Sequence, residues 1–363
     1  MPDYTHPGVY VEESDSDPHP ITGVSTSMAA LVGIASSGPY TPTSIQSFAE
    51  YEELFGGPQE AGFLSHAVRG FFDNGGAQCY VQRVEAAADP AAALQALESL
   101  SDVSIVCSPD AGAIPGMAEA LIQHCEQMRY RIAVLDAPQT PAPTSGPPAA
   151  LRSTRAAYYY PWVLISESAG PGTIAIPPCG HTAGIYARTD SQRGVWRAPA
   201  GQEILGITGL DQLLTDEQDQ ALNAVAVNPL RYFPERGNVV WGARTTSSDP
   251  EWKYINIRRY FIYLEQSIDS GTKWVTFENN GEQLWSAVRQ SVSDFLLKEW
   301  KNSALQGSTP DQAYFVRCDQ TTMTQNDIDN GRLIIEVGVA VIWPAEFVIF
   351  RIGQWTGSAR SGH

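Results

Sequence analysis

The stretch "VSIVCSPDAGAIPGMAEALIQHCEQMRYRIAVLDAP" (residues 103–138) determines the fold class, because it reads as a strand, a helix and a second strand in succession. Short apolar runs at its two ends predict buried strands, and the segment between them predicts a helix. Strands separated by a helix of this length pair in parallel, since the chain needs a crossover to return to the same edge. The sequence therefore predicts an α/β fold with a mixed, largely parallel sheet covered by helices.

The same alternation continues on both sides of this stretch. Upstream, residues 28–35 ("MAALVGIA") predict a buried strand, residues 63–76 a helix ending at Gly75 and Gly76, and residues 79–85 another strand. Downstream, residues 137–150 carry five prolines and predict a surface loop that marks an insertion or a boundary. After this loop, "RAAYYYPWVLIS" (residues 155–166) is predicted to be a helix that runs into a strand.

Two amphipathic helices are predicted in the second half. In residues 248–271, Asp249 is the expected N-cap, Pro250 fits the first helical position, and the apolar face comprises Tyr254, Ile257, Phe261, Leu264 and Ile268. Arg258 and Arg259 on this helix are expected to pair with carboxylates of the same chain.

The second predicted helix covers residues 281–307. Its expected buried side is Leu284, Val288, Val292, Phe295 and Leu296. The expected surface side is Arg289, Lys298, Glu299 and Lys301.

Both ends of the chain are rich in strand-forming residues. At the N-terminus a short strand (residues 7–13) precedes an acidic connector of seven residues, which could span roughly 23 Å when extended. Near the C-terminus, residues 327–353 contain two apolar strands, 333–342 and 346–352, separated by Pro344. An isolated short strand is unstable, so both ends need a sheet to join, in their own chain or in a neighbour.

Composition narrows the classes of partner. The 363 residues include 40 Asp and Glu against 23 Lys and Arg, giving a formal net charge of −17. Nucleic acid and anionic membranes are therefore not expected as partners, because both attract clustered Lys and Arg. Only 17% of residues are charged, against about a quarter in ordinary domains, which leaves uncharged surface for subunit contacts.

No signal peptide and no membrane span are visible, so the chain is expected to start in a cytoplasm. The cysteines are odd in number and scattered, without metal-binding spacing, so they are expected to be reduced and mostly buried: Cys79, Cys107, Cys125, Cys179 and Cys318. No cofactor and no metal site is predicted, since the common nucleotide, metal and nucleophile motifs are all missing from the sequence.

One short segment raises the possibility of catalysis. "STSMAA" (residues 25–30) echoes the segment around the nucleophile of subtilisin-like proteases, with Ser27 as the nucleophile and His181 as a conceivable base. In those proteases the serine comes last of the triad, whereas Ser27 lies near the N-terminus. The favoured interpretation is that these are small residues leading into a buried strand.

Several stretches together resemble the tail sheath proteins of contractile phage tails and of related injection systems. They occur in the family's order and cover nearly the whole chain: "PGVYVEE", "GVSTSMAALVG", "AVRGFFDNGG", "YYYPW", "IPPCGHTAGIYARTDSQRGVWRAPAG", "VNPLRYFPERGNVVWGARTTSSD", "WKYINIRRYF" and "GVAVIWPAEFVIFRI". The resemblance implies a subtilisin-like core without protease activity, which would account for the echo at Ser27. It also implies four regions: an N-terminal arm (1–20), an α/β core (21–240), a smaller α+β region (241–328) and a C-terminal β-arm (329–363).

For function, the resemblance implies a structural subunit that polymerises as stacked rings of six around an inner tube and contracts to drive the tube through a target membrane. Its expected partners are copies of itself, the inner tube protein, and baseplate and terminal cap proteins, without direct insertion into a membrane. Such particles are assembled in a bacterial cytoplasm and act as phage tails or released injection particles. The short chain resembles a minimal sheath core rather than the longer sheaths of many phages.

The resemblance also assigns candidate residues. The strands expected to link subunits contain Val9, Tyr10, Val11, Leu333, Ile334, Ile335, Val337, Val339, Val341, Phe347, Val348, Ile349 and Phe350. Lys298 and Lys301 are the candidates for contact with the tube. The alternatives are a subtilisin-like serine hydrolase and a tube or baseplate component of the same particle.

Overall fold

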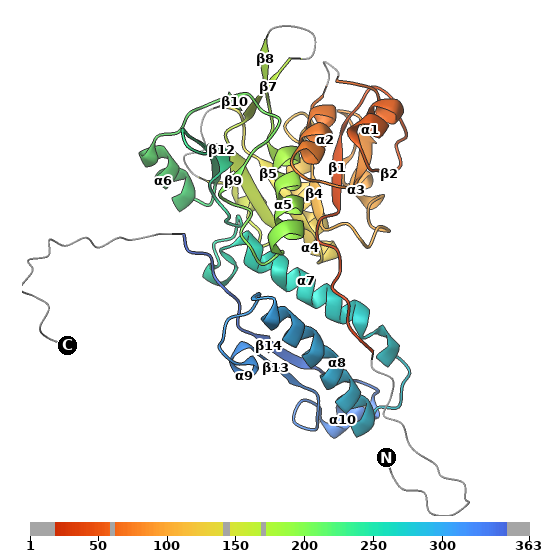
Figure 1. The fold of residues 1–363 in the computed structure, drawn as a ribbon. Coiled ribbons are helices and arrows are strands. Elements are labelled where there is room, and N and C mark those ends of the chain that lie inside the picture. The colour runs from red at the N-terminus through yellow and green to blue at the C-terminus, as the bar shows by residue number, and fades with distance from the viewer. Residues whose placement is uncertain (1–18, 59–61, 141–145, 168–171, 347–363) are drawn as a thin grey trace, which may run out of the picture.

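The computed structural model describes residues 19–58, 62–140, 146–167 and 172–346, which form a large α/β body and a smaller body (Figure 1). Helix α7 (Ile255–Gly271) lies between the two bodies. None of the described helices is both long enough and apolar enough to cross a lipid bilayer.

A nine-stranded sheet forms the centre of the large body. The order across the sheet is β2 (Thr43–Ile45), β3 (Cys79–Val84), β1 (Ala29–Ile34), β4 (Ile105–Cys107), β5 (Ile132–Asp136), β6 (Ala156–Tyr160), β11 (Asn228–Phe233), β12 (Gly237–Val240) and β9 (Gln202–Glu203). Six of these strands, from β3 across to β11, are parallel to one another, while β2, β12 and β9 are antiparallel to their neighbours. This confirms the predicted α/β fold with a mixed, largely parallel sheet.

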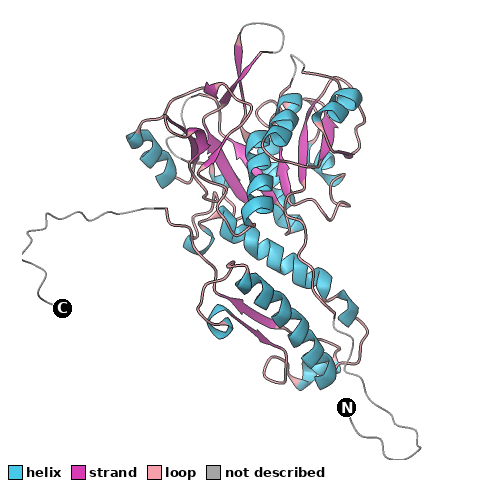
Figure 2. Cartoon of the chain, viewed as in Figure 1, coloured by secondary structure: helices cyan, strands magenta, loops and turns pink. Residues whose placement is uncertain are grey.

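Helices cover both faces of this sheet (Figure 2), so successive residues of a central strand enter two different cores. In β1, Leu31 contributes to one core and Val32 to the other. The first core is covered by α1 (Phe48–Phe55), α2 (Leu64–Asp73) and α5 (Cys179–Arg193). The second core is covered by α3 (Pro90–Gln95), α4 (Met117–Met128), the short helix η1 (Ala149–Leu151) and α6 (Asp216–Ala224).

Helices α2 and α5 pack unusually closely, which explains the glycines in "CGHTAG". A Cβ atom on Gly180 would lie 2.3 Å from the carbonyl oxygen of Ala67, and one on Gly184 would lie 2.4 Å from that of Phe71. Since real Cβ atoms do not approach backbone atoms so closely, only glycine at these two positions allows the helix axes to come this near to each other.

The prediction of a helix within residues 155–166 is wrong. Residues Ala156–Tyr160 form β6, and Val163–Ser166 form β7, which pairs with β8 (Thr173–Ile176) and β10 (Gly209–Leu210) in a separate three-stranded sheet. Ala157 and Tyr159 enter one core while Tyr158 and Tyr160 enter the other. A strand buried on both faces is apolar at every position, so its pattern could not be distinguished from that of a buried helix.

The smaller body is built on α8 (Glu282–Lys301), which packs against a two-stranded sheet of β13 (Tyr314–Arg317) and β14 (Glu336–Val339). The short helices α9 (Pro310–Ala313) and α10 (Gln325–Asp329) complete it. The helix predicted within residues 281–307 is confirmed together with its five buried residues, but it ends at Lys301, several residues earlier than predicted. Glu299, however, was predicted to lie on the surface and is 3% exposed.

Helix α7 belongs to both cores at once. Ile255 and Ile262 lie in a core of the large body, whereas Tyr260 and Leu264 lie in the core of the smaller body. Asp249 caps the short helix η2 (Pro250–Trp252) rather than α7, whose N-cap is Tyr254, so the predicted start of this helix is several residues too early. Its C-terminal end leads through Thr272 into the short helix η3 (Lys273–Val275).

A buried ion pair joins α7 to α5. Arg259 donates from Nη1 and Nη2 to the Asp190 carboxylate at 2.9 and 2.6 Å, and the two side chains are 3% and 5% exposed. The same carboxylate accepts a bond from the Thr26 hydroxyl, and Arg259 donates to the Thr26 carbonyl at 2.9 Å. Arg258 lies 3.6 Å from Glu265. Both arginines therefore pair with carboxylates of their own chain, as predicted.

Removing one partner of this ion pair is expected to be costly. Asp190→Asn leaves the Arg259 guanidinium buried without its counter-charge, so the free energy of unfolding should fall by about 3–5 kcal/mol. Urea unfolding of the unpolymerised chain measures this as a lower midpoint at unchanged m-value. The double variant Asp190→Leu/Arg259→Met should recover most of the loss, and a change below about 1 kcal/mol in Asp190→Asn would contradict the structural weight given to the pair.

Candidate assembly site

The C-terminal residues predicted to link subunits include a stretch that packs on its own chain. Leu333, Ile335, Val337, Val339 and Val341 lie against the core of the smaller body, and β14 pairs in antiparallel register with β13. Ile334 points the other way and is 41% exposed. The period-two pattern is therefore that of a strand with one covered face, and the helix α8 supplies part of the surface that the sequence analysis required for this stretch.

The remaining predicted linking residues lie outside the described part of the chain. They are Val9, Tyr10 and Val11 at the N-terminal end, and Phe347, Val348, Ile349 and Phe350 at the C-terminal end. Their role in linking subunits stays a prediction.

The β13–β14 sheet presents edges on which further strands could be added. Within the described residues it has two strands, so the outer edge of each strand has backbone groups that no other described strand pairs. Its outer face also carries an apolar side chain, since Phe315 is 44% exposed and lies over Gly338. A short exposed edge beside an apolar face is the surface to which an extended segment adds by main-chain hydrogen bonds.

The described start of the chain runs along the C-terminal half of α7, next to this smaller body. The backbone N–H of Val24 donates to Ser267 Oγ at 3.1 Å, and Ile21 packs against Gly271 at the end of the helix. His19 stacks on Trp274 of η3 with ring centroids 4.0 Å apart. The first described residues of the chain therefore lie at the C-terminal end of α7.

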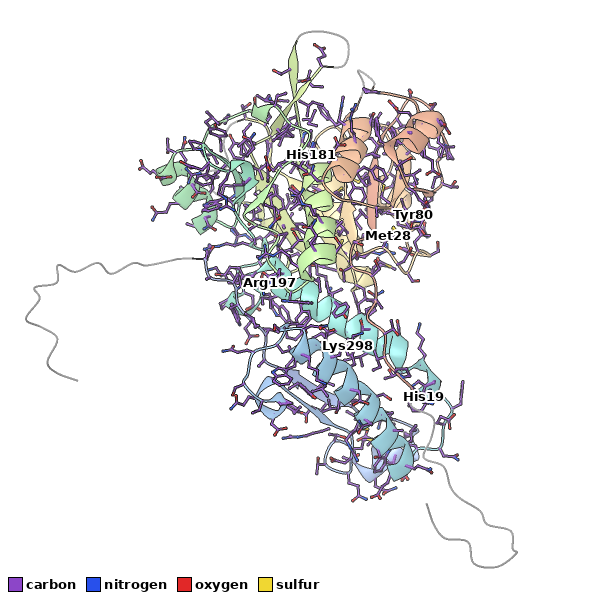
Figure 3. All side chains as sticks on the ribbon, in the orientation of Figure 1. His19, Met28, Tyr80, His181, Arg197 and Lys298 are labelled. Carbon is purple, nitrogen blue, oxygen red and sulfur yellow. The ribbon has the colours of Figure 1, made fainter. Side chains whose placement is uncertain are left out.

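The two candidate tube-contact lysines, Lys298 and Lys301, both lie on the last turns of α8, and Figure 3 labels Lys298 there. Between them in sequence, Glu299 turns inward and accepts hydrogen bonds from the hydroxyls of Tyr260 and Tyr263 at 3.3 and 3.1 Å. Burial raises the pKa of this carboxyl, although both tyrosine hydroxyls oppose the shift. The end of α8 thus presents two exposed cations, while Glu299, which lies between them in sequence, is buried.

The structure does not bring Ser27 and His181 together as a catalytic pair. Ser27 Oγ lies 3.5 Å from Ser25 Oγ, whereas His181, at the start of α5, is 2% exposed and its ring packs against Gly70 (Figure 3). Burial, with the nearby His66, lowers the pKa of His181 to about 4. A base for Ser27 is therefore not provided by the histidine that the sequence offered.

Another potentially reactive side chain, the thiol of Cys179, is also buried. Cys179 begins α5 beside Asp136 at the end of β5, and burial raises the pKa of its thiol well above the ordinary value. A protonated thiol in a closed core is a weak nucleophile. Among the described residues, no group of three or more His, Cys, Asp and Glu is arranged to hold a metal ion.

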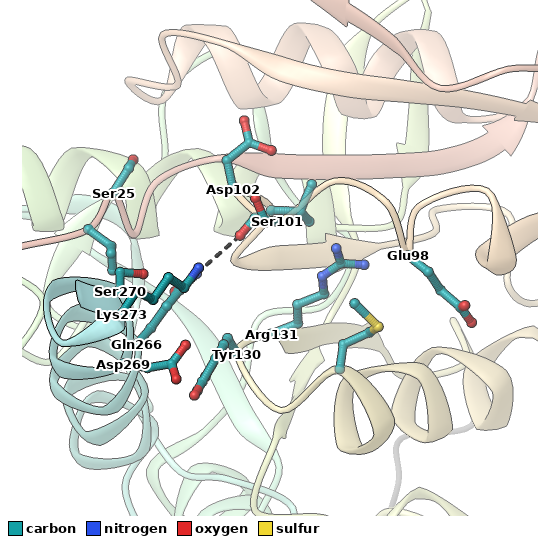
Figure 4. A pocket seen from close by; sticks show the side chains of 13 residues that line it. Ser25, Glu98, Ser101, Asp102, Tyr130, Arg131, Gln266, Asp269, Ser270 and Lys273 are labelled. Atoms are coloured by element: carbon teal, nitrogen blue, oxygen red, sulfur yellow. Dashed lines mark hydrogen bonds between the residues drawn. The ribbon is translucent and has the colours of Figure 1, made fainter. Parts of the chain in front are cut away.

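A cavity of about 410 Å³ lies between the large body and the C-terminal end of α7 (Figure 4). Gln266 crosses it and donates to the Ser101 carbonyl at 3.1 Å. Arg131, which lines the cavity, already donates to Leu97 and Leu100 carbonyls. The cavity lies where the end of α7 meets the large body, and its lining contains no paired nucleophile and base.

No pattern in the sequence indicated the residues where the terminal segments meet the folded body. These are His19 and Trp274 at one end, and Glu346, the last described residue, at the other. They stand in short irregular segments, where neither helical nor strand periodicity applies. The one available signal was the excess of charge and aromatic residues in "WGART" and "EWKYI" just before α7.

Two known protein-family models match most of the chain. The family model for the phage tail sheath protein central domain matches residues 86–246. The model for the phage tail sheath C-terminal domain matches residues 247–354. Together the two models span well over half of the sequence.

Solved structures match over almost the whole chain. The helical sheath of the anti-feeding prophage in its contracted state is 32% identical with a TM-score of 0.85, over 97% of this chain and 99% of that one. The sheath complex of an extracellular contractile injection system, also contracted, is 31% identical with a TM-score of 0.83, over 98% of this chain and 99% of that one.

The matches to curated relatives cover only part of the length of those proteins. A putative prophage major tail sheath protein of Pseudomonas aeruginosa is 26% identical over 259 residues, which are 69% of this chain and 65% of the relative. The tail sheath protein of Enterobacteria phage T4 is 31% identical over 163 residues, 44% of this chain and 24% of the relative. The chain thus spans between a quarter and two thirds of these relatives. From its domain matches and its end-to-end structural likeness, the chain belongs to the phage tail sheath protein family.

Proposed function

We propose that this protein is the contractile sheath subunit of a phage tail-like injection particle. Copies stack as rings of six around an inner tube, and contraction of the stack drives the tube through a target membrane. The observation that carries this proposal is the match over 97–98% of the chain to subunits of two sheaths in their contracted state. A chain that matches both over their full length has the parts that those sheath subunits have.

The arrangement of the folded body supports a mechanical role. Because α7 is buried in both bodies, the described residues form one unit that can reorient as a whole. The proposed division remains an arm (1–20), a core (21–240), a smaller region (241–328) and an arm (329–363), although β14 within the last range pairs with β13 of the smaller body. If each subunit releases a few kcal/mol on repacking, a few hundred subunits supply on the order of several hundred kcal/mol, without a nucleotide.

Strand addition is the proposed means of linking subunits. The N-terminal strand with Val9, Tyr10 and Val11, and the C-terminal strand with Phe347, Val348, Ile349 and Phe350, add to the edges of the β13–β14 sheet of neighbouring subunits. Main-chain hydrogen bonds supply the affinity, and Phe315 together with Ile334 provides apolar contacts outside the smaller body's own core. Leu333, Ile335, Val337, Val339 and Val341 then serve to hold the receiving sheet on α8.

The proposed partners are further copies of the chain, the inner tube, the baseplate and the terminal cap. Assembly takes place in the bacterial cytoplasm, and the finished particle acts as a phage tail or outside the cell. The protein acts mechanically rather than as an enzyme, which accords with the buried state of His181 and Cys179.

Deletion of the N-terminal arm tests the proposal. Electron microscopy of the purified full chain, alone and with its tube protein, should show uniform hollow cylinders. A chain that starts at Ile21 should fold but form none, because each subunit has lost a strand that reaches its neighbour.

A second variant keeps the arm at full length but prevents it from pairing as a strand. Val9→Pro/Val11→Pro removes two backbone donors and should reproduce the deletion. Cylinders of ordinary length from the shortened chain would show that the subunits are not linked through this arm. Small particles from the full chain, even with the tube present, would contradict the sheath proposal itself.

Contact with the tube gives a second prediction. Lys298→Glu/Lys301→Glu should abolish co-assembly with the tube, because the cations at the end of α8 would no longer attract acidic tube residues. Lys298→Arg/Lys301→Arg keeps both charges and should co-assemble normally. Sedimentation of sheath with tube measures the outcome, and normal particles from the charge-reversed variant would show that these lysines are ordinary solvated side chains.

A further inference from the structure

The last described residues carry the chain from the smaller body back to the large one (Figure 1). After β14, the Ala340 N–H donates to the Ala313 carbonyl at 2.7 Å, and Val341 forms a β-bridge with Leu305. Trp343 then packs edge-on against Tyr254, with ring centroids 5.7 Å apart. The C-terminal segment therefore does not leave from the sheet in which β14 lies.

Glu346 ends this path in a set of four donors that we name the Glu346 clamp: Asn223, Arg244, Lys253 and Tyr254. Arg244 donates from Nε and Nη2 to the two carboxylate oxygens at 2.7 and 2.8 Å. The Tyr254 hydroxyl donates at 2.8 Å, Lys253 Nζ at 2.9 Å and Asn223 Nδ2 at 3.1 Å. One carboxylate thus accepts five hydrogen bonds, three of them from cations, which are the strong kind.

The carboxylate stays ionised under ordinary conditions. Burial alone would raise the pKa of Glu346, but the bonds from Arg244, Lys253 and Tyr254 outweigh it and lower the pKa to about 2. A carboxyl with a lowered folded-state pKa contributes its stabilisation above the unfolded-state pKa, about 4.3 for Glu, and loses it as the pH falls toward 2. The Glu346 carboxylate is therefore ionised, and can accept all five hydrogen bonds, throughout the neutral pH range.

The donors of the clamp are themselves fixed to the large body. Arg244 Nη1 donates to the Asn223 carbonyl at 2.6 Å, and its backbone N–H donates to Asn228 Oδ1 of β11, also at 2.6 Å. Arg244 also forms a β-bridge with Tyr254, the N-cap of α7. Glu346 is thus attached to the sheet of the large body and to the start of α7 together.

The two terminal segments consequently meet the folded body at opposite ends of one helix. The N-terminal segment lies at the C-terminal end of α7, where Ile21 packs on Gly271 and His19 on Trp274. The C-terminal segment lies at the other end of α7, at Tyr254, the residue just before the helix begins. A helix of 17 residues is about 25 Å long, so α7 separates the two attachment points by about that distance.

We propose that the Glu346 clamp is the fixed exit point of the C-terminal arm, and that Glu346 is a positioning residue for sheath assembly. Its hydrogen bonds attach residues 343–346, which we call the root of the C-terminal arm, to the large body and the start of α7. The C-terminal arm then starts at a set distance from the N-terminal segment in every subunit. Val341 still belongs to the smaller body through its bridge with Leu305, whereas residues 342–346 add no helix or strand to either body. Five bonds at its end therefore serve to position the arm that begins there. This inference rests on the proposed function.

Glu346→Gln tests the clamp, because it keeps the size of the side chain and removes the charge. The root is monitored in the unpolymerised chain by 19F NMR of 5-fluorotryptophan, with the Trp343 resonance identified from Trp343→Phe. In Glu346→Gln this resonance should move toward the solvent-exposed position. Polymerisation should require at least about a tenfold higher concentration, the size expected from losing charge-assisted contacts that hold the arm root.

Asp219→Asn is the matched control. Asp219 pairs with Arg231 at 3.2 Å, and the exposures of the two side chains, 18% and 12%, are close to the 17% and 13% of Glu346 and Arg244. This variant should leave the Trp343 resonance and the polymerisation threshold unchanged. Lys253→Met, which removes one bond from a partner that is 34% exposed, should fall between wild type and Glu346→Gln in both readouts.

The outcomes separate the clamp from the sheath proposal. An unmoved Trp343 resonance in Glu346→Gln would show that the carboxylate does not hold the root. A released root with wild-type polymerisation would show that the clamp does not position the arm for assembly. If the wild-type chain forms no polymer with its tube protein, the proposed function fails together with the assembly role, while the NMR result still decides whether the clamp holds the root.

Discussion

The burial of α7 on two sides is the constraint on which the rest of the structure depends. One helix supplies Ile255 and Ile262 to the core of the large body and Tyr260 and Leu264 to that of the smaller body. Neither body can turn relative to the other without exposing an apolar face of this helix. The buried pair of Arg259 with Asp190 adds a directional contact, because it fixes α7 to α5 and to the N-terminal segment at Thr26.

This constraint connects the fold to the proposed mechanism. A sheath has to change its overall dimensions while its subunits remain linked, so each subunit needs a rigid body and links that tolerate reorientation. Here α7 braces the folded body, and the two segments proposed to link subunits approach it at opposite ends of α7, one at Trp274 and one at Glu346. On the proposed function, a single helix sets the spacing of the links, and this spacing is expected to stay the same in every state of the particle.

The sequence predicted those features that periodicity and composition control. The alternation of strands and helices, the buried face of α8 and the pairing of Arg259 with a carboxylate are confirmed. Strand β6 was mistaken for a helix because burial on both faces removes its period. Glu299 was placed on the surface because its inward turn depends on Tyr260 and Tyr263, on another helix. Glu346 stood in an apolar run, and its donors lie some 90 to 120 positions earlier in the chain, so no local pattern revealed the clamp.

The most direct test of the account is the distance between the two bodies in different states. Spin labels at Glu217→Cys on α6 and Ser286→Cys on α8, both exposed positions, can be measured by double electron–electron resonance, since the five native cysteines are buried. Labelled subunits are diluted with unlabelled ones before assembly. A rigid subunit should give one narrow distance distribution, the same in the free chain, the extended sheath and the contracted sheath. A distribution that shifts or broadens on contraction would show that the bodies move about α7, and would contradict the rigid subunit.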